Sequence, residues 1–184
     1  YWIAASRTAA YFKNPNIVDT CKGSELVGKD YEPLSRISDA FVTPDQLSRH
    51  YKIYPADYVS TEDGTGAVHT APSFGEEDFQ KGAELDLGLF DPLDTEGKFT
   101  DKVPMWKGLG AKEADKEIIR YFKEQGRVFK QDVIVHSYPH CWRTGVPLIY
   151  RALKTWFLKI DAPVTSKDGI TKTLKEWMVE NNQP

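Results

Sequence analysis

Residues 63–79 of this chain read Asp63-Gly64-Thr65-Gly66-Ala67-Val68-His69-Thr70-Ala71-Pro72-Ser73-Phe74-Gly75-Glu76-Glu77-Asp78-Phe79, and we call this run the motif segment. Gly64 and Gly66 permit tight turning and a close approach of a ligand to the backbone. Residues 67–70 are typical of a short strand, which Pro72 ends because proline cannot donate a hydrogen bond to a ladder. The pattern therefore predicts that His69 lies near the end of a strand.

A helix is predicted directly after that strand, over residues 75–87. Asp78 falls in its first turn, where the helix dipole favours a carboxylate and where the same group can face a ligand amine. The dipole alone would explain an acid at this position, and a histidine in a strand is more often structural than functional. Taken singly, neither Asp78 nor His69 identifies a site.

The rest of the chain predicts a β-rich α+β domain. Short runs rich in aromatic or β-branched residues predict strands at residues 1–6, 57–61, 67–71, 127–137 and 148–160. Loops rich in Gly, Pro and Asp separate these runs, and the Ser- and Pro-containing residues 35–46 predict a long surface loop.

Two further helices are predicted from apolar spacing. In residues 111–125 the apolar positions recur every three or four residues, and Gly126 can end the helix. These positions are Ala111, Ala114, Ile118 and Phe122. A last helix is predicted to begin around Asp168, after the polar residues 163–167, and to carry an apolar stripe. The stripe consists of Ile170, Leu174, Trp177 and Met178.

Composition bounds the class of protein. The 184 residues suffice for one core, and no apolar run approaches the length needed to cross a bilayer, so we expect no membrane segment. The chain begins with Tyr1 rather than Met, from which we expect a fragment of a longer protein. Two distant cysteines, Cys21 and Cys141, favour a reducing compartment, and we therefore expect a cytoplasmic protein.

A formal charge of −3 argues against nucleic-acid binding through a strong overall positive field, so any contact with RNA must be local. A candidate is the stretch 142–159, where cations that can hold phosphates alternate with aromatic rings that can stack on bases. Its members are Trp142, Arg143, Tyr150, Arg151, Lys154, Trp156, Phe157 and Lys159. A half-buried pair of strands would explain the same composition equally well.

The motif segment closely resembles the editing-site segment of isoleucyl-tRNA synthetases, in the run 64–72 and again in 75–79. The related valyl and leucyl enzymes share the first five residues of that run and the later aspartate, but differ at residues 69–72. His69 therefore favours the isoleucyl family. A second block resembles the point where the editing insertion rejoins the synthetic domain in the same enzymes. It reads His136-Ser137-Tyr138-Pro139-His140-Cys141-Trp142-Arg143 and continues through 147–152 and Trp156-Phe157. Residues 22–28 and 31–34 show a weaker resemblance to the stretch before the motif.

This resemblance implies an α+β, β-barrel-rich editing domain with peripheral helices over residues 1–147, truncated at its N-terminus, and a junction towards the synthetic domain over 148–184. It implies hydrolysis of valyl-tRNA(Ile), because a pocket built for isoleucine rejects valine by only about 1–3 kcal/mol per methylene. Asp78 would be the catalytic-site anchor for the substrate α-amino group. His69 would line the side-chain pocket and block isoleucine. The remaining substrate-binding residues implied are Gly64, Thr65, Gly66 and Thr70.

The resemblance also implies partners. These are the 3′ end of tRNA(Ile) carrying a misattached amino acid and the rest of the synthetase, in a monomeric ligase of protein biosynthesis. Editing needs no cofactor, whereas ATP and Mg²⁺ would serve the parent enzyme outside this chain. A threonine-rich peptide that forms one wall of the editing pocket in the family is expected before residues 1–6.

The chain departs from the family at a cysteine knuckle that often binds zinc, since Thr144 stands where the second cysteine is expected. Threonine is not a usual zinc ligand, and His136, His140 and Cys141 fall short of a four-ligand site. We therefore predict no metal. Three alternatives stay open: a valyl or leucyl editing domain, a tRNA-binding module without hydrolytic activity, and a zinc-ribbon binding protein, which predicts stoichiometric zinc.

Overall fold

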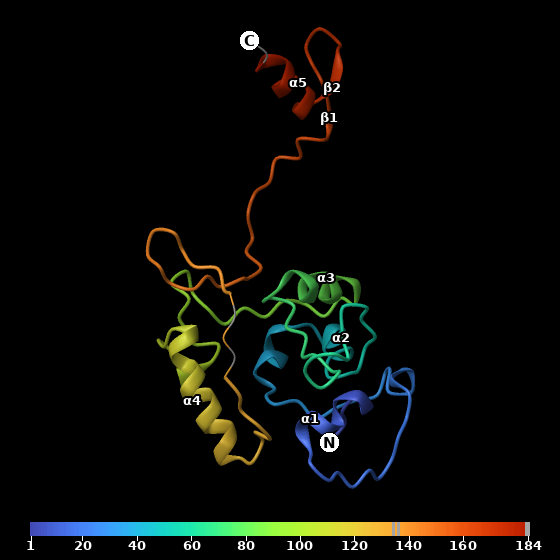
Figure 1. The fold of residues 1–184 in the computed structure, drawn as a ribbon. Helices are drawn as coiled ribbons and strands as arrows, with labels where there is room; N and C mark the ends of the chain where they lie inside the picture. The colour runs from blue at the N-terminus through green and yellow to red at the C-terminus, as the bar shows by residue number, and fades with distance from the viewer. Residues whose placement is uncertain (134, 136, 183–184) are drawn as a thin grey trace. The chain divides into compact units, whose positions relative to one another are not determined.

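A computed structural model describes residues 1–133, 135 and 137–182 (Figure 1). The chain divides into two compact units, Tyr1–Ala152 and Leu153–Pro184. This division follows contacts within the chain, and the predicted boundary after residue 147 stays a prediction. In the described residues, no helix is long and apolar enough to cross a membrane.

The first unit consists of short helices joined by long ordered loops. Its α-helices are α1 (Thr8–Tyr11), α2 (Pro44–Leu47), α3 (Glu76–Glu84) and α4 (Ala111–Glu124). Its 3-10 turns are η1 (Ala5–Arg7), η2 (Gly23–Glu25), η3 (Ile37–Phe41) and η4 (Pro104–Trp106). Residues 35–46, predicted as a surface loop, thus contain η3 and the start of α2. Among the described apolar residues the buried ones are few, namely Leu93, Val103 and Ala114, so the core lies between α4 and the loop that precedes it.

Helix α4 confirms the prediction for residues 111–125. The carboxylate of Glu113 accepts a hydrogen bond from the Gly110 N–H at 3.2 Å and so satisfies a free donor at the helix start. Ala114, in the middle of the predicted apolar stripe, is fully buried. Gly126 adopts a φ of 67° just after the helix, which glycine tolerates without strain.

Helix α3 confirms the helix predicted over residues 75–87, although it ends earlier, at Glu84. Asp86 adopts a φ of 47° two residues beyond the end, which takes the chain out of the helical conformation. Backbone hydrogen bonds close the end of the helix, from the Asp86 N–H to the Ala83 carbonyl at 3.2 Å and from the Leu87 N–H to the Gly82 carbonyl at 2.8 Å. The helix therefore has a defined start in the motif segment and a defined end.

The second unit is a small hairpin followed by a helix. Strands β1 (Pro163–Thr165) and β2 (Thr171–Thr173) pair antiparallel, and α5 (Leu174–Asn181) follows. Thr173 and Glu176 form a capping box at the start of α5, with the Thr173 N–H donating to the Glu176 carboxylate at 2.7 Å. The predicted start near Asp168 is wrong, because Gly169 takes a φ of 79° in the turn between the strands.

The predicted β-barrel-rich fold is wrong. The strands of the described residues are β1 and β2, which form one open two-stranded sheet, and the runs 1–6, 57–61, 67–71 and 148–160 form no strand. The described residues of 127–137 form no strand either, and residues 134 and 136 lie outside the described residues. A strand needs a neighbour to pair with and apolar cover for its side chains. Val133 and Trp156 are 88% and 100% exposed, so their runs have no such cover.

Candidate functional site

The motif segment starts with a glycine turn that packs against the beginning of the chain. Gly64 and Gly66 have φ values of 56° and 80°. The Ala4 N–H donates to the Thr65 carbonyl at 2.8 Å, and Arg7 Nε donates to the Gly64 carbonyl at 3.0 Å. A Cβ on Gly66 would lie 2.6 Å from the Ala4 Cβ. Any side chain at residue 66 would therefore displace the turn.

His69 and Thr70 follow this turn in irregular chain rather than in the predicted strand. His69 is exposed and Thr70 is half-buried. Within the described residues the His69 imidazole makes no hydrogen bond or ion pair, so both ring nitrogens are open to a ligand. The described contacts do not join His69 to Asp78.

Asp78 lies in the first turn of α3, as the sequence predicts. Its Oδ2 atom accepts a hydrogen bond from the Ala71 N–H at 3.3 Å, which ties the helix start back to the preceding turn. The Oδ1 atom has no hydrogen-bond partner among the described residues. Asp78 is half-buried, and its Oδ1 atom can still accept a hydrogen bond from a ligand.

Ser73 is the buried residue of the motif segment, and no sequence pattern around it predicts this burial. It is 3% exposed, and its Oγ atom has no hydrogen-bond partner among the described residues. The Ser73 carbonyl accepts the Ala152 N–H at 2.8 Å, while the Phe74 N–H closes the turn onto the Ala71 carbonyl at 2.8 Å. The turn that leads into α3 is thus held from both sides by main-chain hydrogen bonds.

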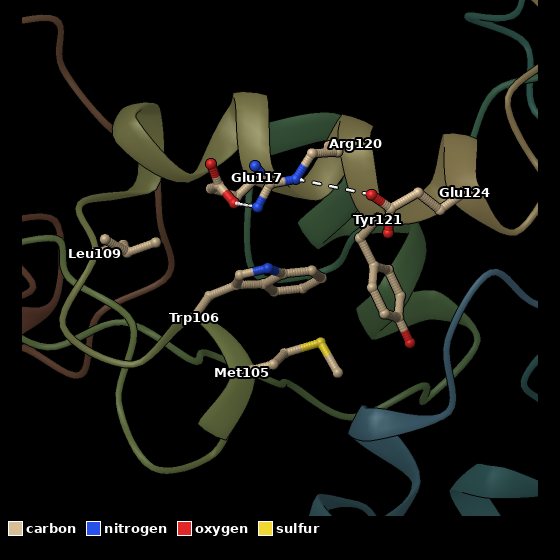
Figure 2. Close-up of a pocket in the computed structure, with 7 residues that line it drawn as sticks. All are labelled: Met105, Trp106, Leu109, Glu117, Arg120, Tyr121 and Glu124. Atoms are coloured by element: carbon tan, nitrogen blue, oxygen red, sulfur yellow. Dashed lines mark hydrogen bonds and ion pairs between the residues drawn. The ribbon is translucent and has the colours of Figure 1, made fainter.

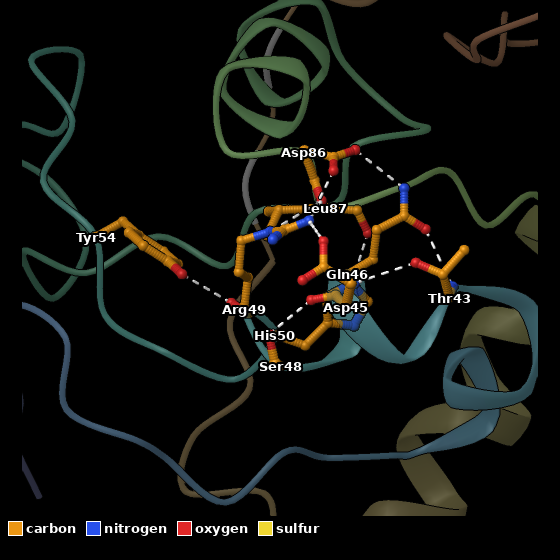
Figure 3. Close-up of polar contacts among 9 residues, drawn as sticks. All are labelled: Thr43, Asp45, Gln46, Ser48, Arg49, His50, Tyr54, Asp86 and Leu87. Carbon is orange, nitrogen blue, oxygen red and sulfur yellow. Dashed lines mark hydrogen bonds and ion pairs between the residues drawn. The ribbon is translucent and has the colours of Figure 1, made fainter.

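The far end of α3 is held in a different way, by polar and charged side chains from α2 and the residues after it (Figure 3). Asp86 accepts hydrogen bonds from Arg49 at 2.6 Å and from Gln46 at 3.0 Å, one on each carboxylate oxygen. His50 Nε2 lies 2.6 Å from the Leu87 carbonyl and therefore donates to it. We call these contacts the α2 latch.

A cavity of about 400 Å³ lies between η4 and α4 (Figure 2). Its lining combines apolar and aromatic side chains with one arginine and two glutamates: Met105, Trp106, Leu109, Glu117, Arg120, Tyr121 and Glu124. Arg120 pairs with Glu117 and, at 4.0 Å, with Glu124. No residue of the motif segment lines this cavity, so the hollow and the chemistry-bearing segment are separate features.

The residues predicted to contact RNA divide into two groups. Trp142 is 87% exposed, with the Arg143 guanidinium 4.9 Å from the centre of its ring. Arg151 is instead engaged by Asp91, at 2.5 Å, and its side chain is only 14% exposed. These contacts argue against a phosphate contact at Arg151, since all three of its guanidinium nitrogens donate to protein acceptors. Lys154, Trp156, Phe157 and Lys159 belong to the second unit.

The cysteine knuckle is closed by hydrogen bonds of its own. The Thr144 hydroxyl, followed by the main-chain N–H groups of Thr144 and Arg143, lowers the pKa of the Cys141 thiol by hydrogen bonding to its charged form. No group of three or more His, Cys, Asp or Glu side chains able to hold a metal occurs in the described part of the chain. His136, which the sequence raised as a ligand, lies outside the described residues, and the absence of zinc stays a prediction.

Comparison with known proteins gives the family. The chain is 41% identical over 166 residues, 90% of its length, to an isoleucine–tRNA ligase of Clostridium novyi. It is 41% identical over 98% of its length to that of Corynebacterium efficiens and 43% identical over 85% to that of Pyrococcus abyssi. No family model matches the chain.

These relatives are aminoacyl-tRNA ligases. Within that class the chain belongs to the isoleucine–tRNA ligase family, since relatives from bacteria and an archaeon match nearly all of it. The chain spans only 14–16% of the length of these ligases. It therefore corresponds to one part of such an enzyme.

Proposed function

We propose that this chain carries the hydrolytic editing site of an isoleucine–tRNA ligase and that the site releases valine from misacylated tRNA(Ile). Isoleucine and valine differ by one methylene, worth about 1–3 kcal/mol of discrimination, so a synthetic site alone makes errors that a second site must remove. The partners are the 3′ end of tRNA(Ile) and the rest of the ligase. ATP and Mg²⁺ serve the synthetic reaction outside this chain.

Asp78 carries the proposal. It offers one unused carboxylate oxygen at the start of α3, while the other oxygen is fixed by the Ala71 N–H. A carboxylate held at one oxygen can accept a charge-assisted hydrogen bond from an ammonium group at the other. The α-amino group of the attached amino acid is such a group, and binding it would orient the ester carbonyl for attack by water.

His69 supplies the size filter in this proposal. Its exposed imidazole makes no hydrogen bond within the described residues, so it can line a pocket whose other contacts come from the substrate. Backbone groups of Gly64, Thr65 and Gly66, together with Thr70, would bind the terminal ribose and the amino acid. A residue that excludes isoleucine by its bulk protects the correct product from hydrolysis.

The test is deacylation by complete ligases that carry single substitutions. Asp78→Ala is expected to reduce hydrolysis of valyl-tRNA(Ile) by about 100-fold or more, since it removes a positioned charged contact, with isoleucine activation unchanged. His69→Ala is expected to make isoleucyl-tRNA(Ile) a substrate. Normal deacylation by the Asp78→Ala ligase would refute the editing site.

A second candidate is a surface that binds tRNA without hydrolysing it, which the exposed Trp142 and its stacked Arg143 favour. Under this reading Trp142→Ala weakens tRNA binding, and Asp78→Ala leaves deacylation unchanged. The two substitutions therefore separate the two functions in one pair of assays.

A further inference from the structure

Arg151 is held by an ion pair with Asp91, which lies sixty residues earlier in the chain and belongs to the same unit. Its Nε and one terminal nitrogen donate to Asp91 Oδ2 at 3.0 and 2.5 Å. The guanidinium also donates to the Leu93 carbonyl at 2.9 Å and to the Asp94 carbonyl at 2.5 Å. The side chains of Arg151 and Asp91 are 14% and 22% exposed. A planar guanidinium makes these four hydrogen bonds from three separate nitrogens, whereas an ammonium group has three donors on a single atom.

The loop that receives Arg151 is itself fixed. Asp91 Oδ1 accepts the Leu93 N–H at 3.0 Å, and Leu93 is part of the small core. Asp94 Oδ1 accepts the N–H groups of Glu96 and Lys98 at 2.8 and 3.0 Å. Arg151 is thus bound to a rigid support and not to a mobile surface loop.

Ala152, the residue after Arg151, links this anchored segment to the motif segment. Ala152 donates its N–H to the Ser73 carbonyl at 2.8 Å. Ser73 is buried two residues after Ala71, whose N–H binds the Asp78 carboxylate. Because Arg151 fixes the backbone of residues 151 and 152, it also fixes where the Ala152 N–H meets the turn before α3.

We infer that Arg151 is a positioning residue for the proposed editing site: through Ala152 and Ser73 it sets the place of the turn that holds Asp78. The inference rests on the proposed function for its consequence in catalysis, whereas the mechanical link rests on the contacts alone. Arg151 touches no reacting atom. A displaced Asp78 would still bind substrate but would present the ester poorly to water, so kcat falls more than KM rises.

The experiment uses the complete ligase and two substitutions that break the link at different points. Arg151→Met removes the guanidinium, while Ala152→Pro keeps the guanidinium, removes the N–H that reaches Ser73 and restricts the backbone at residues 151 and 152. Each is expected to accelerate amide hydrogen exchange in residues 71–78 by about tenfold or more, with α4 unchanged. Each is expected to lower kcat for deacylation of valyl-tRNA(Ile) by about 10- to 100-fold, with isoleucine activation unchanged. Arg151→Lys should recover little, since one ammonium cannot replace the fork.

Arg127→Met is the matched control. Arg127 pairs with Glu32 at 2.9 Å and donates to the Pro33 carbonyl at 3.0 Å, and both partners lie outside the motif segment. Exchange in residues 71–78 and deacylation should both stay at the level of the unsubstituted ligase. Equal acceleration by Arg127→Met would mean general destabilisation and would overturn the inference.

The inference and the proposed function fail in distinguishable ways. If Asp78→Ala abolishes deacylation while Arg151→Met and Ala152→Pro leave it and the exchange of residues 71–78 unchanged, Arg151 is not a positioning residue. If Asp78→Ala leaves deacylation intact, the proposed function fails. The exchange comparison with Arg127→Met then still decides whether Arg151 fixes the turn.

Discussion

The two ends of α3 are held by different chemistry. At the C-terminal end Asp86 has a hydrogen bond on each carboxylate oxygen, supplied by Arg49 and Gln46 of the α2 latch. At the N-terminal end Asp78 has one, from the Ala71 N–H at 3.3 Å. A carboxylate with a protein donor on each oxygen has fewer sites left for a ligand than one with a donor on a single oxygen, which keeps the other oxygen for an incoming donor. The same residue type is therefore structural at one end of the helix and a candidate for binding at the other.

The supports of the two ends differ as well. The α2 latch consists of exposed or half-exposed charges, and the pKa of Arg49 is raised chiefly by its hydrogen bond to Asp45. The N-terminal end depends on buried packing and main-chain hydrogen bonds, through Ser73 and through the contact of Pro72 with Gly82. Packing tolerates less change than exposed ion pairs do, so substitutions at the N-terminal end should cost more.

The largest effect is expected for Gly82→Ala. A Cβ on Gly82 would lie 2.5 Å from the Pro72 Cβ, and the proline ring cannot rotate away. Overpacking costs about 1–3 kcal/mol, against about 1 kcal/mol that alanine gains over glycine in a helix. We expect a net loss of up to about 2 kcal/mol in the free energy of unfolding, measured by urea titration of tryptophan fluorescence, and faster exchange in residues 71–78 than in the α2 latch.

The matched control is Gly23→Ala, because a Cβ on Gly23 meets nothing within 4 Å. Its effect should stay within about 0.5 kcal/mol of zero. A stabilising Gly82→Ala would show that helix propensity outweighs the contact with Pro72, and the distinction between the two ends of α3 would lose its basis in packing.

A smaller and more local effect is expected for Arg49→Gln. This substitution removes the charge that binds Asp86 and the donors to the Asp86 carbonyl, at 3.2 and 3.3 Å. Since exposed ion pairs contribute little, exchange at residues 85–87 should accelerate by less than about tenfold. Deacylation of valyl-tRNA(Ile) should be unchanged. A large loss of deacylation would mean that the α2 latch, and not only the motif segment, positions Asp78.

The sequence predicts the parts of the fold that depend on local chemistry. Helix α4 has its apolar spacing, its acidic residue at the third position and its terminal glycine within residues 110–126, and it forms where predicted. Asp78 falls in the first turn of α3 for the same reason. Strand predictions failed because aromatic and β-branched residues signal a strand only where a neighbouring strand exists, and the exposed runs around Val133 and Trp156 have none in the described residues.

The parts that could not be predicted depend on distant contacts. No residue near Arg151 in the sequence points to Asp91 as its partner, so the sequence leaves open whether this cation contacts RNA or belongs to a half-buried part of the fold. The structure shows the pair with Asp91. Ser73 likewise has no local sign of its burial or of its bond to Ala152. The resemblance of the motif segment identified the family, which the comparisons confirm, while the roles of His69 and Asp78 stay predictions.

The smallest effect is expected from pH, at the loop that supports Arg151. Main-chain hydrogen bonds, first from Lys98 and then from Glu96, lower the pKa of the Asp94 carboxyl below its ordinary value of 3.8. A lowered pKa in the folded state means that the ionised carboxylate stabilises the loop above the unfolded value, and that this contribution is lost as the pH falls through the folded value. Below about pH 4, the protection of the Glu96 and Lys98 amides should therefore decrease. Asp94→Asn keeps an oxygen acceptor without titrating, so the variant should lack this step in amide protection measured by NMR, and the difference between the two proteins removes the contribution of other carboxyl groups. An identical pH profile in the variant would show that the Asp94 carboxylate does not hold the loop, and the support of Arg151 would then rest on the Asp91 carboxylate and on the Leu93 and Asp94 carbonyls.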